Sequence, residues 1–371
     1  MSKDHFVPRH YLRQFTINRT EMIMAASASP YKCDKPVGIG GHCCKDNFYE
    51  EHAALNKVLG TIENETAPAL VRVAGQKYFD DNDLGKLQLL AVILHHRTKK
   101  AAEAAKVLPR YLTLKTIQSA IKQGKLPPYP GGEISGEMWD FKGVPGSMIQ
   151  GTGFCLMEMQ TLKCKLLQSP NGAHFVTSDH PVIILNQFCA GADAYRSYAG
   201  FSCFGFQLLM PICPNLCIFF YDEQAYRVGS RRSGQLVTVS EQDVEIVNSL
   251  QVQSAENWLY FHDIKLEQVV QRLVYRYGNL RVQVQDALKV IPTKEQNKKL
   301  LLTRASTVKL PTPWNFCRKR KDTKFKPGDI RNPAWTALGE KFMEDVDKNP
   351  SDEDIFNRLQ KFREKFIKEC V

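Results

Sequence analysis

The sequence predicts an α+β fold in which a helical N-terminal half packs on a mixed β-sheet from the second half. The first half carries apolar residues at helical spacing, whereas the second carries short β-branched and aromatic runs separated by turn signals. Residues 289–371 are strongly basic, with 20 Lys and Arg against 12 Asp and Glu. We therefore expect one α+β domain over 1–290 and a basic, helical C-terminal extension over 291–371.

The N-terminal stretch 5–15 has the character of a docked segment, although chain termini are usually poorly ordered. It places Tyr11, Leu12 and Phe15 at helical spacing, with Pro8 just before them. A short helix with these residues on one side would bury that side against the domain. We expect such docking to carry His5 inward, so that deletion of the first dozen residues disables the whole protein.

Two long helices are expected in the first half. Apolar residues recur at helical spacing over 48–73, where Pro68 should interrupt or restart the helix. The acidic cluster at 80–83 is a strong N-terminal cap, which predicts a second helix over about 84–108. The middle of this second helix is apolar on all sides, and we expect it at the centre of the domain.

The second half is expected to supply the main sheet. Strands are predicted at 174–185, 204–210, 216–221 and 235–239, and a short strand or hairpin in the first half over 21–31. Ser240 and Asp243 have the spacing of a capping box, so a helix should begin there. Further helical segments are expected at 265–277 and 341–370, and the Pro- and Gly-rich stretch 123–153 is either a long loop or a soft internal boundary.

The composition argues against several classes of protein. No apolar run approaches the roughly 18 residues that span a membrane, and the N-terminus lacks the apolar segment of a signal peptide. We therefore expect a soluble, cytoplasmic protein without a membrane partner. The 11 cysteines are an odd number without paired zinc-finger spacing, and most are expected to be buried small hydrophobes. The sequence also lacks a Gly-Lys-Ser/Thr phosphate loop, a nucleophile elbow and a dinucleotide fingerprint.

Several short motifs, in one order along the chain, resemble a known family. They are His5-x-x-Pro8-x-x-Tyr11-Leu12-x-x-Phe15, Ile62-Glu63, Arg97-Thr98, Thr177-Ser178-Asp179-His180-Pro181, a Leu-Met-Pro strand end at Pro211, and Asn248. In these motifs the chain is similar to the prokaryotic domain-of-unknown-function family 4238, over roughly residues 1–262. The resemblance implies a prokaryotic protein but no agreed activity, so the chemistry has to come from the residue types.

Six polar residues at the matched positions form the candidate site: His5, Glu63, Arg97, Ser178, Asp179 and Asn248. They come from different elements, as the residues of an assembled active site usually do. One interpretation is a structural Glu63–Arg97 ion pair, because an unpaired buried charge is costly. The other is a pocket shared with His5 and Asp179, in which His5 is a general base and Arg97 binds phosphate or carboxylate. Ser178 and Asp179 are also common turn formers at a strand end.

A divalent metal is the cofactor that this set admits, with His5, Glu63 and Asp179 as ligands. No short motif links these three residues, so neither a metal nor its identity is fixed by the sequence. His95 and His96 are neighbours on a helix and point in different directions, so we expect at most one of them to join Arg97 in a site.

Two functions from different classes fit these observations. The first is a hydrolase or nuclease-like enzyme acting on a phosphate-containing substrate, for example in bacterial defence. The second is a non-catalytic binding or regulatory protein whose polar set is a buried structural network. The basic segment 314–326 is either a solvated charge run or an arm that binds nucleic acid or another phosphate-containing ligand through Arg318, Lys319, Arg320 and Lys321, with its aromatics stacking on bases.

Overall fold

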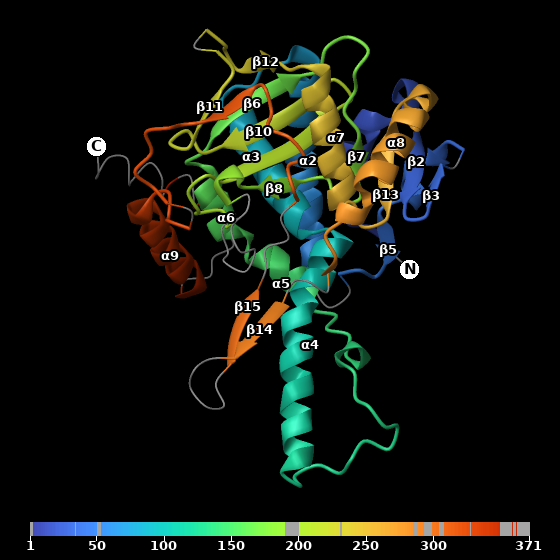
Figure 1. Cartoon of the computed structure of the whole chain (residues 1–371), viewed down its shortest axis with the longest axis vertical. Helices are drawn as coiled ribbons and strands as arrows, with labels where there is room; N and C mark the ends of the chain where they lie inside the picture. Colours follow the sequence, from blue (N-terminus) through green and yellow to red (C-terminus); the bar gives the residue numbers. More distant parts are fainter. Residues whose placement is uncertain are drawn as a thin grey trace.

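Figure 1 shows the chain as a computed structural model. The residues it describes are 3–33, 35–49, 53–189, 200–230, 232–284, 288–292, 299–303, 308–326, 328–348, 358 and 361. The strands form several separate sheets, and most neighbouring strands are antiparallel. The chain does not follow the repeated strand–helix–strand order of an α/β protein. The predicted α+β class is therefore confirmed.

A five-stranded mixed sheet carries much of the core, in the order β12-β6-β10-β9-β8. Its strands are β6 (Lys163–Gln168), β8 (Ile183–Leu185), β9 (Gln207–Cys213), β10 (Leu216–Tyr221) and β12 (Leu236–Thr238). The pair of β12 with β6 is parallel and the other neighbouring pairs are antiparallel. All of β10 is buried, because alternate side chains enter two different hydrophobic clusters. A strand covered on both faces reads as a continuous apolar run, which is why the sequence identifies it.

A second sheet joins the N-terminus to the second half of the chain. Its order is β3-β2-β13-β7, with β4 (Val37–Gly38) also paired to β2. Of the strand or hairpin predicted over 21–31, the structure has the hairpin, formed by β2 (Met22–Ala28) and β3 (Tyr31–Cys33). It is extended by β13 (Trp258–Phe261) and then β7 (Thr177–Ser178). Strands from both halves therefore build the sheets, and not those of the second half alone.

Helix α2 (Ala53–Gln76) continues through Pro68, so the expectation that this proline breaks the helix is wrong. Ala69, Leu70 and Val73, which follow the proline, are at most 1% exposed. Their burial in the core compensates for the hydrogen bond that proline cannot donate.

The single helix predicted over 84–108 is two helices, α3 (Asp81–His96) and α4 (Lys99–Lys122). Thr98 has extended backbone, and its Oγ1 accepts a hydrogen bond from the N–H of Ala101, which starts α4 in a new direction. Arg97 is placed at this corner. In Figure 1, α4 extends away from the body of the protein.

The chain returns from α4 through the Pro- and Gly-rich loop and two short helices, α5 (Val144–Gln150) and α6 (Thr152–Met159). Helices α7 (Glu241–Ser254) and α8 (Glu267–Tyr277) pack together beside the second sheet. The capping box predicted at the start of α7 is present. Ser240 Oγ accepts from the N–H of Asp243 at 3.2 Å, and Asp243 Oδ2 accepts from the N–H of Ser240 at 3.1 Å.

The C-terminal part forms two further strand pairs and one helix. β14 (Leu288–Pro292) pairs with β15 (Lys299–Thr303), and β11 (Tyr226–Val228) pairs with β16 (Cys317–Lys319). Helix α9 (Pro333–Lys348) covers the start of the helix predicted over 341–370, and most of the rest of that prediction lies outside the described residues. None of the helices in the described ranges combines the length and apolar character that crossing a membrane requires.

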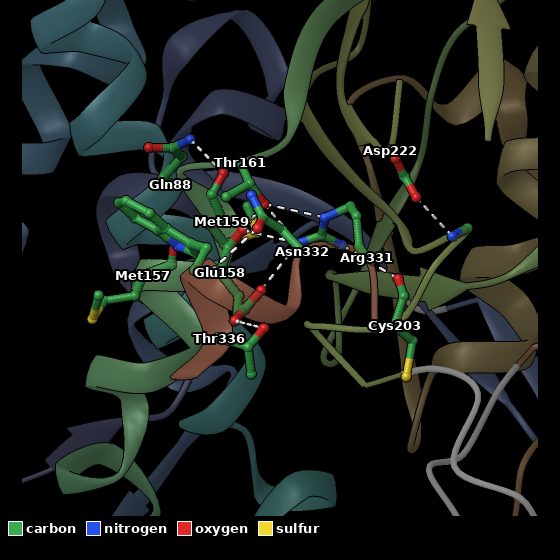
Figure 2. A network of polar contacts seen from close by, with 12 residues as sticks. Gln88, Met157, Glu158, Met159, Thr161, Cys203, Asp222, Arg331, Asn332 and Thr336 are labelled. Carbon is green, nitrogen blue, oxygen red and sulfur yellow. Dashed lines mark hydrogen bonds and ion pairs between the residues drawn. The ribbon is translucent and has the colours of Figure 1, made fainter. Parts of the chain in front are cut away.

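A buried ion pair fixes the C-terminal part to the domain (Figure 2). Arg331 Nη2 lies 3.3 Å from Glu158 Oε2, and both side chains are 1% exposed. Arg331 also donates to Thr161 Oγ1 at 2.8 Å and to the carbonyl of Cys203 at 3.3 Å, while Thr336 Oγ1 donates to Glu158 Oε1 at 2.8 Å. The segment around α9 is thus packed against the domain, and the proposed division of the chain at 290 stays a prediction.

Candidate functional site

The N-terminal segment is docked as the sequence indicates. β1 (Lys3–His5) pairs with β5 (Cys44–Asp46), and the short helix α1 (Arg9–Leu12) follows. Tyr11, Leu12 and Phe15 are fully buried. The hydroxyl of Tyr11 donates to the carbonyl of Pro211 at 2.5 Å and lies 2.9 Å from Thr177 Oγ1. The first residues therefore belong to the core that both sheets share.

Arg97 connects this docked segment to α2. Its Nη1 donates to Glu63 Oε1 at 2.8 Å, and its Nη2 donates to the backbone carbonyl of His5 at 2.6 Å. The guanidinium side chain is 4% exposed, whereas that of Glu63 is 31% exposed. The Glu63–Arg97 ion pair that the sequence suggested is present, and the contact with His5 is to its main chain rather than its imidazole.

Two imidazoles, those of His5 and His10, lie near the Glu63 carboxylate. His10 Nδ1 lies 3.8 Å from Glu63 Oε2, and Nε2 of both His5 and His10 is buried without a hydrogen-bond partner in the described chain. Burial and the nearby charge of Arg9 lower the pKa of His5, so its imidazole is neutral at pH 7. Burial raises the pKa of Glu63, but the nearby His10 imidazole and the ion pair with Arg97 outweigh it and lower that pKa overall. Chemically, this corner offers a carboxylate beside a neutral imidazole.

Asp179 is an anchor for main-chain amides. Its Oδ1 accepts from the N–H of Glu256 at 2.8 Å, and its Oδ2 accepts from Asn257 at 2.8 Å and Trp258 at 3.0 Å. These bonds fix the turn between α7 and β13. Burial raises the pKa of Asp179 to about 6, although the three N–H donors favour the ionised form.

Ser178 and Asn248 hold α7 against β7. Ser178 Oγ donates to Gln251 Oε1 at 2.7 Å. Asn248 Oδ1 accepts from the N–H of Val176 at 2.9 Å, and its Nδ2 donates to the carbonyl of His174 at 2.8 Å. Both residues are buried, so each polar group has a partner that offsets its loss of water.

The six predicted residues thus fall into two groups of direct contacts. His5, Glu63 and Arg97 meet at the N-terminal segment, whereas Ser178, Asp179 and Asn248 lie around β7 and α7. Within the described residues, no hydrogen bond or ion pair joins Asp179 to the first group. A single pocket formed by all six stays a prediction.

A histidine cluster lies between α3, α4 and β7, and it is not predicted by the sequence. The rings of His95 and His180 are 5.6 Å apart, and His180 Nδ1 lies 2.6 Å from Thr98 Oγ1. Lys100 Nζ donates to the carbonyl of Ser254 at 2.7 Å. Burial lowers the pKa of His180 to about 3 and that of Lys100 to about 8. These groups come from distant parts of the chain, so the tripeptide His95-His96-Arg97 was the one signal in the sequence that pointed to the cluster.

The rings of His95 and His96 lie 4.9 Å apart, and both contact Phe201. The ring of His95 lies 6.0 Å from that of Phe201, and the ring of His96 lies 5.9 Å from it. The cavity beside His95 and His180 has a volume of about 10 Å³, room for a single water molecule. Across the described ranges, no three His, Cys, Asp or Glu side chains are arranged to hold a metal ion.

The basic segment is anchored by its aromatic residues. Trp314 and Phe316 are 4% and 7% exposed and belong to a core cluster, so the prediction that they stack on nucleic-acid bases is wrong. They were mistaken for surface residues because the charges around them dominate the local composition. Of the four predicted contact residues, Arg318, Lys319 and Lys321 are exposed and Arg320 is partly buried.

Comparison with known proteins identifies a family but no activity. The family model described as "Protein of unknown function (DUF4238)" matches residues 3–265, well over half of the chain. This range includes all six predicted site residues and ends before β14. Searches of curated proteins and of solved structures give no match. The chain therefore belongs to the DUF4238 family, as its motifs indicate.

Proposed function

We propose that this chain is a non-catalytic ligand-binding or regulatory protein, and that its six matched polar residues form a structural framework. The observation that carries the proposal is that the polar atoms of these side chains form hydrogen bonds with main-chain groups. Arg97 binds the carbonyl of His5, Asp179 binds three amides, and Asn248 binds one amide and one carbonyl. Side chains committed to main-chain groups of distant segments hold a fold together and have few donors or acceptors left for a substrate.

Burial supports the same interpretation. Arg97, Asp179 and Asn248 are each 3% exposed, and Ser178 is fully buried. A catalytic group has to come within hydrogen-bond reach of a substrate, about 2.6–3.2 Å. A substrate could reach these atoms only if the surrounding main chain moved.

The experiment compares activity with stability in the same variants. Wild type is incubated with Mg²⁺ or Mn²⁺ and single-stranded DNA, RNA, ATP or p-nitrophenyl phosphate, and no turnover above the buffer blank is expected. Arg97→Lys and Asp179→Asn should lower the thermal midpoint by several degrees, whereas Arg13→Lys, at an exposed ion pair with Glu21, should not. Metal-dependent turnover that His5→Ala abolishes without changing the thermal midpoint would overturn the proposal.

A second candidate function is a hydrolase or nuclease-like enzyme acting on a phosphate-containing substrate. The observation in its favour is the partly exposed Glu63 carboxylate near the imidazoles of His5 and His10, whose Nε2 atoms have no partner in the described chain. In that mechanism, neutral His5 accepts a proton from the attacking water, and Arg97 balances the charge of Glu63. The assay above separates the two candidates, because only the enzyme requires turnover that depends on His5.

Three further expectations about location, source and ligand remain proposals. They are a cytoplasmic location, a prokaryotic source with a role in bacterial defence, and binding of a phosphate-containing ligand or nucleic acid through the basic segment. The exposed Arg318 and Lys319 support the choice of an anionic ligand. Increasing salt should weaken such binding steeply if several phosphates are contacted.

A further inference from the structure

We propose that the cavity beside β16 binds a phosphate-bearing small molecule of nucleotide size, with its phosphate at Arg318, which lines the cavity, and beside Arg227, the cross-strand neighbour of Arg318. The inference rests on the proposed ligand-binding function and gives that function a site. The cavity has a volume of about 620 Å³. This lies within the range of about 300–1,000 Å³ that is usual for small-molecule sites.

The two arginines form a cross-strand pair of like charge. Arg227 on β11 is the direct register partner of Arg318 on β16, so both side chains leave the same face of this two-stranded ribbon. Both are exposed, and neither forms an ion pair with a described residue. Like charges directly opposite each other destabilise a strand pair. An anion bound between them removes that repulsion, and guanidinium groups bind phosphate with two parallel hydrogen bonds.

Hydroxyl and amide groups extend the polar wall of the cavity next to Arg318. Its polar lining, besides Arg318, consists of Ser230, Ser233, Thr238, Ser240, Asp243 and Asn315. Hydroxyl groups both donate and accept, so they can bind the oxygens of a phosphate ester or a sugar.

The one acidic side chain in this lining, Asp243, is already occupied. Its Oδ2 accepts from the N–H and the hydroxyl of Ser240, and its Oδ1 accepts from the N–H of Asn315 at 2.8 Å. Both of its carboxylate oxygens therefore already accept hydrogen bonds from the protein. Among the described residues, neither guanidinium of the arginine pair has an ion-pair partner, so both can bind an anion.

The rest of the lining is apolar, which is why we specify a nucleotide-sized molecule rather than phosphate alone. Leu236, Val237 and Val239 supply aliphatic surface in the same cavity, and Phe316, which is 7% exposed, contributes only a small part of the lining. An apolar wall beside a cationic polar wall fits a ligand with a flat ring at one end and a phosphate at the other. A polymer is a poorer fit, because the neighbouring aromatic Trp314 is buried in the core and offers no stacking surface.

The test measures the binding of ADP and of inorganic phosphate to the full chain by isothermal titration calorimetry. We expect ADP to bind at least tenfold more tightly than inorganic phosphate. Arg318→Gln and Arg227→Gln should each weaken ADP binding at least tenfold. Lys324→Gln removes an exposed positive charge of the same segment that neither lines the cavity nor pairs across the strands with Arg318, and it should change the affinity less than threefold. Thermal midpoints of all variants without ligand establish that each is folded.

The outcomes separate this inference from the proposed function. Absence of ADP binding to folded wild type, or equal losses in Arg318→Gln and Lys324→Gln, would overturn the site. A 20-nucleotide DNA that binds more tightly than ADP and depends equally on all three cations would replace it with a nucleic-acid surface. If ADP binds as expected but is hydrolysed, the site stands and the non-catalytic assignment fails.

Discussion

Replacement of Arg97 by alanine should strongly destabilise the protein, because this side chain connects the docked N-terminal segment to α2. The change removes two charge-assisted hydrogen bonds, of 2.8 Å to Glu63 and 2.6 Å to the carbonyl of His5. Bonds of this kind contribute about 1.5–3 kcal/mol each. Glu63 keeps some contact with water, at 31% exposure, so its orphaned charge is partly hydrated. We therefore expect a loss of about 3 kcal/mol in the free energy of unfolding.

Urea titration followed by circular dichroism measures this free energy. Arg97→Lys keeps the charge but has a single ammonium group that cannot reach both acceptors, so about half of the loss should remain. Arg13→Ala is the matched control, because it breaks the exposed Arg13–Glu21 pair and should cost less than about 1 kcal/mol. The reasoning fails if Arg97→Ala stays within 1 kcal/mol of wild type.

Three further predictions follow from other contacts. Deletion of residues 1–12 removes the fully buried Tyr11 and should abolish the cooperative unfolding transition, and a soluble truncated chain with a native near-ultraviolet spectrum would contradict this. Because the pKa of His180 is about 3 in the folded state and about 6.5 in an unfolded chain, its contribution to stability is complete above pH 6.5 and decreases as pH falls toward 3. The loss should reach about 2 kcal/mol at pH 5, and His180→Gln should reduce this acid sensitivity in a pH series of urea titrations. Arg331→Met leaves the buried Glu158 without its ion-pair partner and should lower the free energy of unfolding by about 3–5 kcal/mol. The double variant with Glu158→Gln should recover part of this loss. Equal stabilities of the single and double variants would refute the coupling between the two residues.

The parts of the fold that follow from neighbouring residues were predictable. The capping box of α7, the buried strand β10 and the docked residues Tyr11 and Phe15 all depend on patterns a few positions long. Errors arose where packing overrides a local preference. α2 tolerates Pro68 because the turn beyond it is buried, and the helix predicted over 84–108 divides because Thr98 caps a new helix.

The candidate site shows the same division. Glu63 and Arg97 were expected to pair, since each is a charge near the apolar face of its helix and a buried charge needs a partner. The sequence could not indicate that Asp179 would hold three amides of the 256–258 turn, because that contact spans 77 to 79 positions. Nor could it reveal the histidine cluster, whose rings come from α3 and from the end of β7.

By itself, the sequence determined the family, the α+β class, the docked N-terminus and the Glu63–Arg97 pair. Each depends on residue type and short-range spacing, which limit the backbone whatever lies around it. The tertiary structure alone decided that Arg331 reaches Glu158, that Trp314 is buried, and that Arg227 faces Arg318 across two strands. Such contacts depend on which distant segments pack together. This packing is determined by the burial of apolar surface in the whole core and not by any local pattern of residues.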